Sequence, residues 1–165
     1  MQKRGDRHMD IAFKKASDFN RGILFELLSD AYSFDRNYEN TCKEKWQENE
    51  NFFFDNLQIA DKFCFITTLN DEAIGYVSWD PRNMPAYAEI GDNCIITKHK
   101  GNGYGKLQLQ EAINRIKQYK VEKIIVTTDD GLIPAQRMYE SVGFTMHRKR
   151  NNGNIVKIDY VLSLQ

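Results

Sequence analysis

The middle of the chain reads Ile95-Ile96-Thr97-Lys98-His99-Lys100-Gly101-Asn102-Gly103-Tyr104-Gly105-Lys106-Leu107. An apolar, strand-like run comes first, a basic turn with three glycines follows, and apolar residues then recur at helical spacing as far as Tyr119. Glycine lacks a Cβ, so the backbone of this turn can approach a ligand closely. The first N–H groups of a helix have no internal partners and carry the positive end of its dipole. This order of strand, turn and helix therefore predicts an anion site, for which phosphate is the usual ligand.

The spacing of the glycines excludes three familiar phosphate-binding loops. A P-loop requires Gly, and then Ser or Thr, at positions that hold Lys100 and Leu107. The dinucleotide fingerprint and the kinase glycine-rich loop require a third glycine where this chain has Lys106 or Gln108. The remaining pattern has a base at 100 and glycines at 103 and 105. On the loop alone, a tight connection with glycines that only serve turn geometry explains the pattern equally well.

Composition and charge favour a single globular domain and argue against nucleic-acid or membrane partners. The 165 residues are enough for a sizeable core, and 23 basic residues balance 23 acidic ones. No apolar run approaches the roughly 20 residues of a membrane span, and no signal peptide is visible. Three cysteines without a Cys-x-x-Cys motif favour the cytoplasm. His8, His99 and His147 form no metal-ligand spacing, so we expect no metal.

Hydrophobic periodicity predicts a mixed α/β fold that combines hairpins with parallel crossovers. Residues 1–8 are predicted to form a flexible tail and residues 9–165 a single domain. Ser17 and Asp18 are expected to cap the first helix. The predicted order is β-α-α-β-β-β-α-β-α-β-β, over residues 10–16, 17–32, 41–58, 62–69, 72–79, 86–97, 103–119, 122–128, 134–141, 145–150 and 155–162. A mixed sheet flanked by helices follows from this order.

The glycine turn resembles the pyrophosphate loop of the GNAT superfamily, the acetyl-CoA-dependent N-acyltransferases. The pattern of that loop is Arg/Gln-x-x-Gly-x-Gly/Ala, and the chain has Lys100-x-x-Gly103-x-Gly105. Lys100 departs from the usual Arg or Gln, because it keeps a positive charge but lacks the fork geometry of Arg. The element order is also the one that the superfamily shows, from about Met9 onward.

A second segment, Pro134–Phe144, is similar to the family's Asn-x-x-Ala-x-x-x-Tyr-Glu-x-x-Gly-Phe motif. Ala135, Tyr139, Gly143 and Phe144 fall in place, whereas the Asn position holds Leu132. One helix and one strand separate the two motifs, in the order of the family. The resemblance implies a GNAT-type mixed, mostly antiparallel sheet of about six or seven strands flanked by about four helices.

The resemblance implies acetyl-CoA as the acyl donor. The implied cofactor-binding residues are Ile95, Ile96, Thr97, Lys100, Gly101, Asn102, Gly103, Tyr104, Gly105, Lys106 and Ala135. The N–H groups of residues 101–106 would hold the pyrophosphate with Lys100 adding charge, and residues 95–97 would pair with the pantetheine arm. An N–H group at Ile95 or Ile96 would bind the thioester oxygen. Leu132 puts in doubt a contact that relatives make near the cofactor with Asn.

Two residues are candidates for proton transfer. Tyr139 would protonate the departing thiolate, since a phenol with a pKa near ~10 is a donor at neutral pH. Glu89 would take the proton of the amine through water, as carboxylates on this strand do in relatives. Strand alternation puts Glu89 on the same face as Asn93 and Asp92 on the other, unless a bulge intervenes. An exposed Glu89 paired with a neighbouring Lys is an equally good interpretation.

The implied activity is direct transfer of an acetyl group, in a ternary complex, to a primary amine of a small molecule or a peptide. Residues 33–40 and the following helix carry many aromatic side chains, which fit core packing best and an acceptor-binding wall second. The alternative function is a non-catalytic acyl-CoA-binding regulatory module. Tyr139 favours the enzyme, whereas Lys100 and Leu132 leave room for the module. Relatives are often dimers, so a homodimer is compatible with the resemblance.

Overall fold

The computed structural model describes residues 10–164, so the tail predicted at residues 1–8 lies outside the described residues. The helices are α1 (Ile23–Ala31), α2 (Arg36–Asp55), α3 (Leu57–Phe63), α4 (Tyr104–Lys117) and α5 (Ile133–Ser141). The strands are β1 (Ile11–Lys14), β2 (Cys64–Leu69), β3 (Glu72–Asp80), β4 (Tyr87–Ile95), β5 (Lys123–Asp129), β6 (Thr145–Asn152) and β7 (Ile155–Ser163). Short 3₁₀ turns span Ala16–Asp18 and Thr97–His99.

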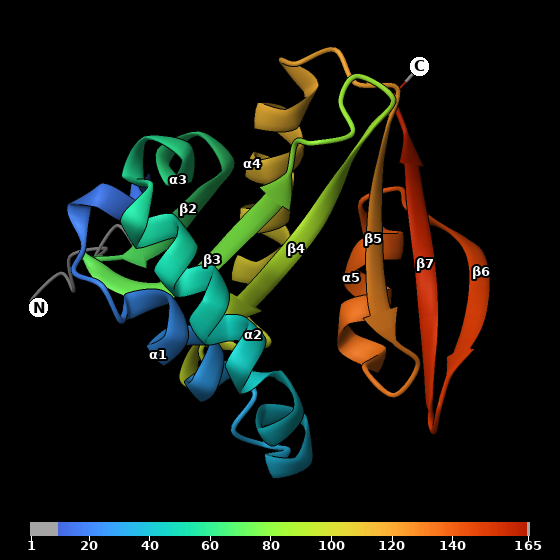
Figure 1. The fold of residues 1–165 in the computed structure, drawn as a ribbon, viewed down its shortest axis with the longest axis horizontal. Coiled ribbons are helices and arrows are strands. Elements are labelled where there is room, and N and C mark those ends of the chain that lie inside the picture. Colours follow the sequence, from blue (N-terminus) through green and yellow to red (C-terminus); the bar gives the residue numbers. More distant parts are fainter. Residues whose placement is uncertain (1–9, 165) are drawn as a thin grey trace, which may run out of the picture.

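The strands form one seven-stranded sheet in the order β1-β2-β3-β4-β5-β7-β6. Each neighbouring pair is antiparallel except β4 and β5, which run parallel across the crossover helix α4. The predicted mixed, mostly antiparallel sheet is therefore confirmed. Figure 1 shows that the two halves of the sheet meet at β4 and β5, where the strands diverge toward one end of the molecule.

Helices cover both faces of the sheet and create two hydrophobic cores. On one face, Leu109 and Ile116 of α4 pack with Ile124 of β5. On the opposite face, Leu24 of α1 packs with Ile66 of β2 (Figure 1). Each fully buried side chain of this kind contributes about 1.5–3 kcal/mol to the free energy of folding. The sheet is thus held rigidly from both sides, close to the point where β4 and β5 separate.

The first helix begins later than predicted. Ser17 caps no helix, because its N–H and hydroxyl both donate to the carboxylate of Asp61, at 3.0 and 2.6 Å. Asp18 closes a 3₁₀ turn by accepting from the N–H of Lys15 at 3.3 Å. The helix starts only after Gly22, whose φ of 110° places it in the left-handed region. The predicted caps are therefore wrong, because Ser17 donates instead to Asp61, which lies far along the chain.

The second predicted helix is two helices, which makes five α-helices among the described residues rather than about four. Asn56 interrupts it with φ −137° and ψ 60°. Its side-chain amide donates to the carbonyl of Phe52 at 2.8 Å and closes α2, while its own carbonyl accepts from Ile59 and Ala60 and opens α3. Asn side chains commonly compete for backbone groups in this way, and here the competition turns the chain.

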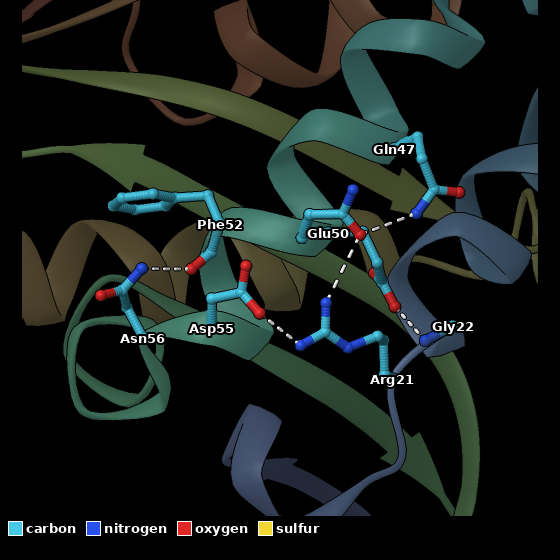
Figure 2. A network of polar contacts seen from close by, with 8 residues as sticks. Arg21, Gly22, Gln47, Glu50, Phe52, Asp55 and Asn56 are labelled. Atoms are coloured by element: carbon cyan, nitrogen blue, oxygen red, sulfur yellow. Dashed lines mark hydrogen bonds and ion pairs between the residues drawn. The ribbon is translucent and has the colours of Figure 1, made fainter.

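A buried carboxylate in α2 holds the N-terminus of α1. Glu50 is 1 % exposed, and it accepts a hydrogen bond from the N–H group of Gly22 (Figure 2). It accepts another from the N–H group of Phe25. These N–H groups belong to the first turn of α1, which has no intrahelical acceptors and carries a positive partial charge. Arg21 adds a contact to Asp55 of α2. The network fixes how α1 lies against α2.

Replacing Glu50 with alanine is expected to lower the free energy of unfolding by about 2–4 kcal/mol, because it leaves buried amides without an acceptor. Urea unfolding followed by far-ultraviolet circular dichroism measures the change. Glu48→Ala is the matched control, since Glu48 lies on the same helix with its side chain 71 % exposed. It should change stability by less than about 0.5 kcal/mol. Equal losses in the two variants would contradict the capping role of Glu50.

Candidate active site

A β-bulge in β4 changes which side chains face each helix layer. Val77 of β3 pairs with Asn93, but Trp79 pairs with Ile90, so β4 holds one extra residue between these pairs. The side chains confirm the shift: Ile90 lies in the core beneath α4, whereas Cys94, of the same parity, lies in the core beneath α1. In a regular strand both would point the same way.

Because of the bulge, polar side chains of β4 point to other faces of the sheet than predicted. Glu89 points opposite to Ile90, toward the face that carries α1 and α2. Asp92 points the same way, because its carboxylate accepts from the side-chain amide of Asn49 in α2 at 3.2 Å. Asn93 points toward α4. Simple alternation had placed Glu89 with Asn93 and apart from Asp92, and the extra residue reverses both relations.

The backbone of β4 is left unpaired on one side beyond the bulge. The parallel ladder with β5 ends at the pair Ile90–Val126, while β4 continues to Ile95 (Figure 1). β4 therefore splays away from β5 beyond this pair. A strand end with open N–H and C=O groups can pair with an extended polar ligand.

The hydrogen-bond pattern with β3 identifies which groups face this gap. Ile96 donates its N–H to the carbonyl of Ile74 on β3 at 2.8 Å. In an antiparallel ladder such pairs alternate, so the N–H and C=O groups of Ile95 and Asn93 point away from β3, into the gap. Of the two N–H groups predicted to bind a thioester oxygen, the one at Ile95 is available and the one at Ile96 is already used.

The turn after β4 is tied to the C-terminal end of α1. Asp30 accepts from the N–H of Thr97 at 2.7 Å and, through its carbonyl, from the Thr97 hydroxyl at 2.9 Å. Lys100 donates its ammonium to the carbonyl of Ala31, and its Nζ lies 4.7 Å from the centre of the Phe34 ring. Thr97 and Lys100 thus act within the fold. These contacts lie within the protein, and the roles predicted for the two residues toward pantetheine and phosphate stay predictions.

The glycines of the turn leave open space where a ligand can approach. Gly101 and Gly103 have φ values of 79° and 84°, and a Cβ built on either would meet nothing within 4 Å. Gly105 differs, because its Cβ would lie 3.1 Å from the sulfur of Met138 in α5. Gly105 therefore lets α4 approach α5, while the other two glycines keep the outer side of the turn clear.

The amides of the turn are free to bind an anion. Within residues 10–164, the N–H groups of Gly101, Asn102 and Gly103 donate to no protein acceptor. The first turn of α4 adds the N–H groups of Gly105 and Lys106, which precede the first intrahelical bond at Leu107. The side-chain amide of Asn102 donates to the carbonyl of His99 at 3.3 Å and stabilises the turn. The predicted cradle is therefore formed by the backbone.

Tyr139 lies on α5 behind the gap and is 5 % exposed. Its ring contacts Phe144 and Tyr160, with ring centroids 5.7 and 6.0 Å away, and Ala135 on the same helix packs against the same core. Burial raises the pKa of Tyr139, and the neighbouring Asn93 side chain partly offsets this by lowering it. The phenol is therefore protonated at neutral pH and can act as a proton donor.

A model of the acetyltransferase (GNAT) family matches residues 23–144. The chain belongs to the GNAT family. The match covers the splayed strand, the glycine turn and α5 with Tyr139, so the geometry above lies within the family domain. No curated protein matches the sequence.

Solved structures share the GNAT fold over nearly the whole chain. A protein from Desulfovibrio desulfuricans assigned to the GNAT acetyltransferases has a TM-score of 0.76 at 14% identity, covering 95% of this chain and 99% of its own. The yncA protein of Salmonella typhimurium, solved with its cofactor acetyl-CoA, has 0.74 at 15% identity, covering 95% and 94%. A Bacillus anthracis protein assigned as a streptothricin acetyltransferase, solved with acetyl coenzyme A, has 0.57 at 24% identity over 62% of each chain.

On the face of the GNAT sheet that carries α1 and α2, ionisable aromatic and acidic groups surround Tyr32. Burial raises the pKa of Tyr32, and so do neighbouring groups that become negative on ionisation. These groups are Tyr38, Cys94, Tyr139 and Asp92. Tyr32 also stacks on Tyr38 with a centroid distance of 4.6 Å. Part of the aromatic set is thus core, as predicted, and part lies beside the candidate site.

Two absences hold for residues 10–164. None of the helices there combines the length and the apolar character of a membrane span. No group of three or more His, Cys, Asp or Glu is placed to hold a metal ion.

Two amides of the site escaped the sequence analysis. Gln108 of α4 is fully buried and bonds to Asn93 of β4 at 2.8 Å. One signal was present in the sequence, because Gln108 is the single amide on a helical stripe that otherwise carries Leu109, Ala112 and Ile116. No signal marked Asn93, because its facing depends on the bulge.

Proposed function

We propose that this GNAT protein transfers the acetyl group of acetyl-CoA directly to a primary amine of a small molecule or a peptide. The observation that carries the proposal is a set of backbone groups without protein partners among residues 10–164, on the free edge of β4 and in the glycine turn. On β4 these groups belong to Asn93 and Ile95, and Asn93 is a neighbour of Tyr139. The acetyl-CoA complexes of the Salmonella and Bacillus proteins support the same donor here.

The residues present fit the pyrophosphate and the pantetheine arm of the donor. Gly101 and Gly103 leave room for a pyrophosphate at amides that lack acceptors. The free edge of β4 at Ile95 suits the amides of a pantetheine arm. The bound donor supplies an acyl group activated as a thioester. The protein's own part is to bind this group, to polarise its carbonyl with the N–H of Ile95 and to protonate the leaving sulfur from Tyr139.

Direct transfer is favoured over an acyl-enzyme because the cysteines are poor nucleophiles. A cysteine reacts as its thiolate. Burial raises the pKa of Cys64 to about 12, and it raises the pKa of Cys42 and of Cys94. The neutral thiol is therefore the form of all three side chains near pH 7, and the amine itself must attack the acyl group in the ternary complex.

Glu89 is the proposed base, acting on the amine through water. Burial raises its pKa, as do the carboxylates of Asp80 and Asp159. Within residues 10–164 it accepts no hydrogen bond and forms no ion pair, so the predicted alternative of a lysine partner lacks support. Asp92 on the same face has a pKa raised by burial too, but Tyr76 and Asn49 both donate to it, at 3.0 and 3.2 Å. Glu89 is thus the freer acceptor of a proton.

Glu89→Gln is expected to lower kcat/KM for the amine by about 10²-fold at pH 7.5, since general bases contribute on this scale. The loss should shrink as pH rises toward the pKa of the free amine, near ~10.4, because the amine then arrives already neutral. Initial rates from pH 6 to 10 measure it. Asp92→Asn, the matched control on the same face, should show a smaller loss at pH 7.5. A constant deficit in Glu89→Gln at every pH would rule out the base role.

The proposed function is tested by following free thiol released from acetyl-CoA with a panel of primary amines and peptides. Amine-dependent release is expected, together with thermal stabilisation of the protein by CoA. Stabilisation by CoA without release for any amine would support the acyl-CoA-binding module instead. The absence of any CoA binding would refute both functions.

A further inference from the structure

A buried donor beside Tyr139 has no partner. Gln108 donates its side-chain N–H to Oδ1 of Asn93 at 2.8 Å. The other polar atom of that amide, Nδ2 of Asn93, is buried and has no hydrogen-bond partner among the described residues. Buried donors are nearly always satisfied, because leaving one unpaired is costly. The persistence of this one calls for a functional explanation.

The orientation of both amides follows from their neighbours. Oε1 of Gln108 accepts from the Thr67 hydroxyl at 2.7 Å, and its Nε2 lies 3.0 and 3.1 Å from the carbonyls of Tyr76 and Cys94. A carbonyl cannot donate, so the nitrogen of Gln108 must point to these oxygens. Nε2 then donates to Asn93 as well, which makes the facing atom of Asn93 its oxygen. The donor Nδ2 is thereby directed away from Gln108.

Tyr139 is a neighbour of Asn93 in the core beneath α4 and α5. Asn93 is the side chain that lowers the pKa of Tyr139. The ring of Tyr139 is otherwise surrounded by the apolar core and by Phe144 and Tyr160. An amide N–H donates but does not accept, so the phenol oxygen can accept from Asn93 and cannot give it a proton.

We propose that Asn93, held by Gln108, is a positioning residue that directs the Tyr139 proton toward the leaving sulfur. The proposal rests on the proposed acetyl transfer. Nδ2 of Asn93 donates to the phenol oxygen, which leaves the O–H free to point into the gap beside β4. The O–H bond breaks as the proton passes to the sulfur and an S–H bond forms. Asn93 stabilises the resulting phenolate until it takes a proton from water.

The first test compares Asn93→Leu in two backgrounds. In the wild-type background kcat should fall about tenfold, the scale of one hydrogen bond, with the Kd for acetyl-CoA unchanged. In the Tyr139→Phe background the same substitution should have no further effect, since Asn93 acts through the phenol. An equal loss in both backgrounds overturns the proposal and leaves the proposed function standing. Gln108→Met, of similar volume, should give a smaller loss with the same dependence on Tyr139.

The second test needs no turnover and so remains valid if no amine is acetylated. The titration of Tyr139 is followed by NMR of protein labelled at Cζ of tyrosine, assigned with Tyr139→Phe. Asn93→Leu should raise the midpoint, because the phenolate then loses a hydrogen-bond donor. A midpoint of Tyr139 that does not rise, or a phenol that stays protonated in both proteins up to alkaline unfolding, overturns the proposal.

Discussion

Replacing Tyr139 with phenylalanine is expected to lower kcat by about 10²- to 10³-fold, within the range that general acids contribute. The ring packs against Phe144 and Tyr160, and phenylalanine keeps that packing. Only the proton donor is lost, and it acts mainly in the transition state. The Kd for acetyl-CoA should therefore stay within about twofold. Steady-state thiol release gives kcat, and isothermal titration calorimetry gives Kd.

Tyr160→Phe is the matched control for this prediction. Tyr160 lies in the same core, 2 % exposed, and its hydroxyl donates to Glu140 at 3.1 Å. Its removal should change kcat by less than about threefold, since a single structural hydrogen bond is lost away from the gap. If the two variants lost activity equally, Tyr139 would have no special role. A raised Kd in Tyr139→Phe with kcat unchanged would make Tyr139 a binding residue instead.

The parts of the candidate site whose local structure is as predicted depend on local rules. The glycine turn follows from residues adjacent in sequence, and the free amides at Gly101 and Gly103 follow from positive φ and from the start of a helix. Tyr139 was named from the resemblance of Pro134–Phe144 to the family motif, which is also local in sequence. Neither depends on which distant strand pairs with which.

The parts that were missed depend on pairing between distant segments. The bulge in β4 is set against Ser78 of β3, whose hydroxyl accepts from the N–H of Asp92 at 3.2 Å. The alternation of residues along β4 alone does not reveal the extra residue of the bulge. The facing of Glu89 and Asn93 was therefore wrong for one physical reason. The contact of Lys100 was missed for a similar reason, because its acceptor is a carbonyl at the end of α1.

Residues placed by local sequence and residues placed by distant pairing have different roles in the proposed enzyme. Local sequence builds a surface of backbone amides at the turn and the edge of β4, and many acyl groups or amines are compatible with such a surface. Tertiary pairing then selects which side chains reach it, namely Asn93 from one face and Glu89 from the other. Proton transfer at the site is thus controlled by the bulge, and cofactor binding by the turn.

Gly103→Val is expected to raise the Kd for acetyl-CoA by at least about 10²-fold, because several charge-assisted hydrogen bonds to amides of the turn are lost together. A Cβ at Gly103 meets no protein atom within 4 Å, so a valine would project into the space that we assign to the pyrophosphate. Calorimetric titration with acetyl-CoA measures the loss of binding.

Gly153→Val is the control for backbone strain, which by itself should not weaken acetyl-CoA binding. Gly153 has a φ of 67° against 84° at Gly103, and a Cβ there also meets nothing within 4 Å. Either valine forces a branched side chain into the left-handed region, which costs about 1–3 kcal/mol of stability. Urea unfolding should show similar losses for both variants, whereas only Gly103→Val should weaken acetyl-CoA binding. If both variants bound acetyl-CoA like the wild type, the turn would not be the pyrophosphate site, because the valine at 103 would occupy the ligand's place without effect.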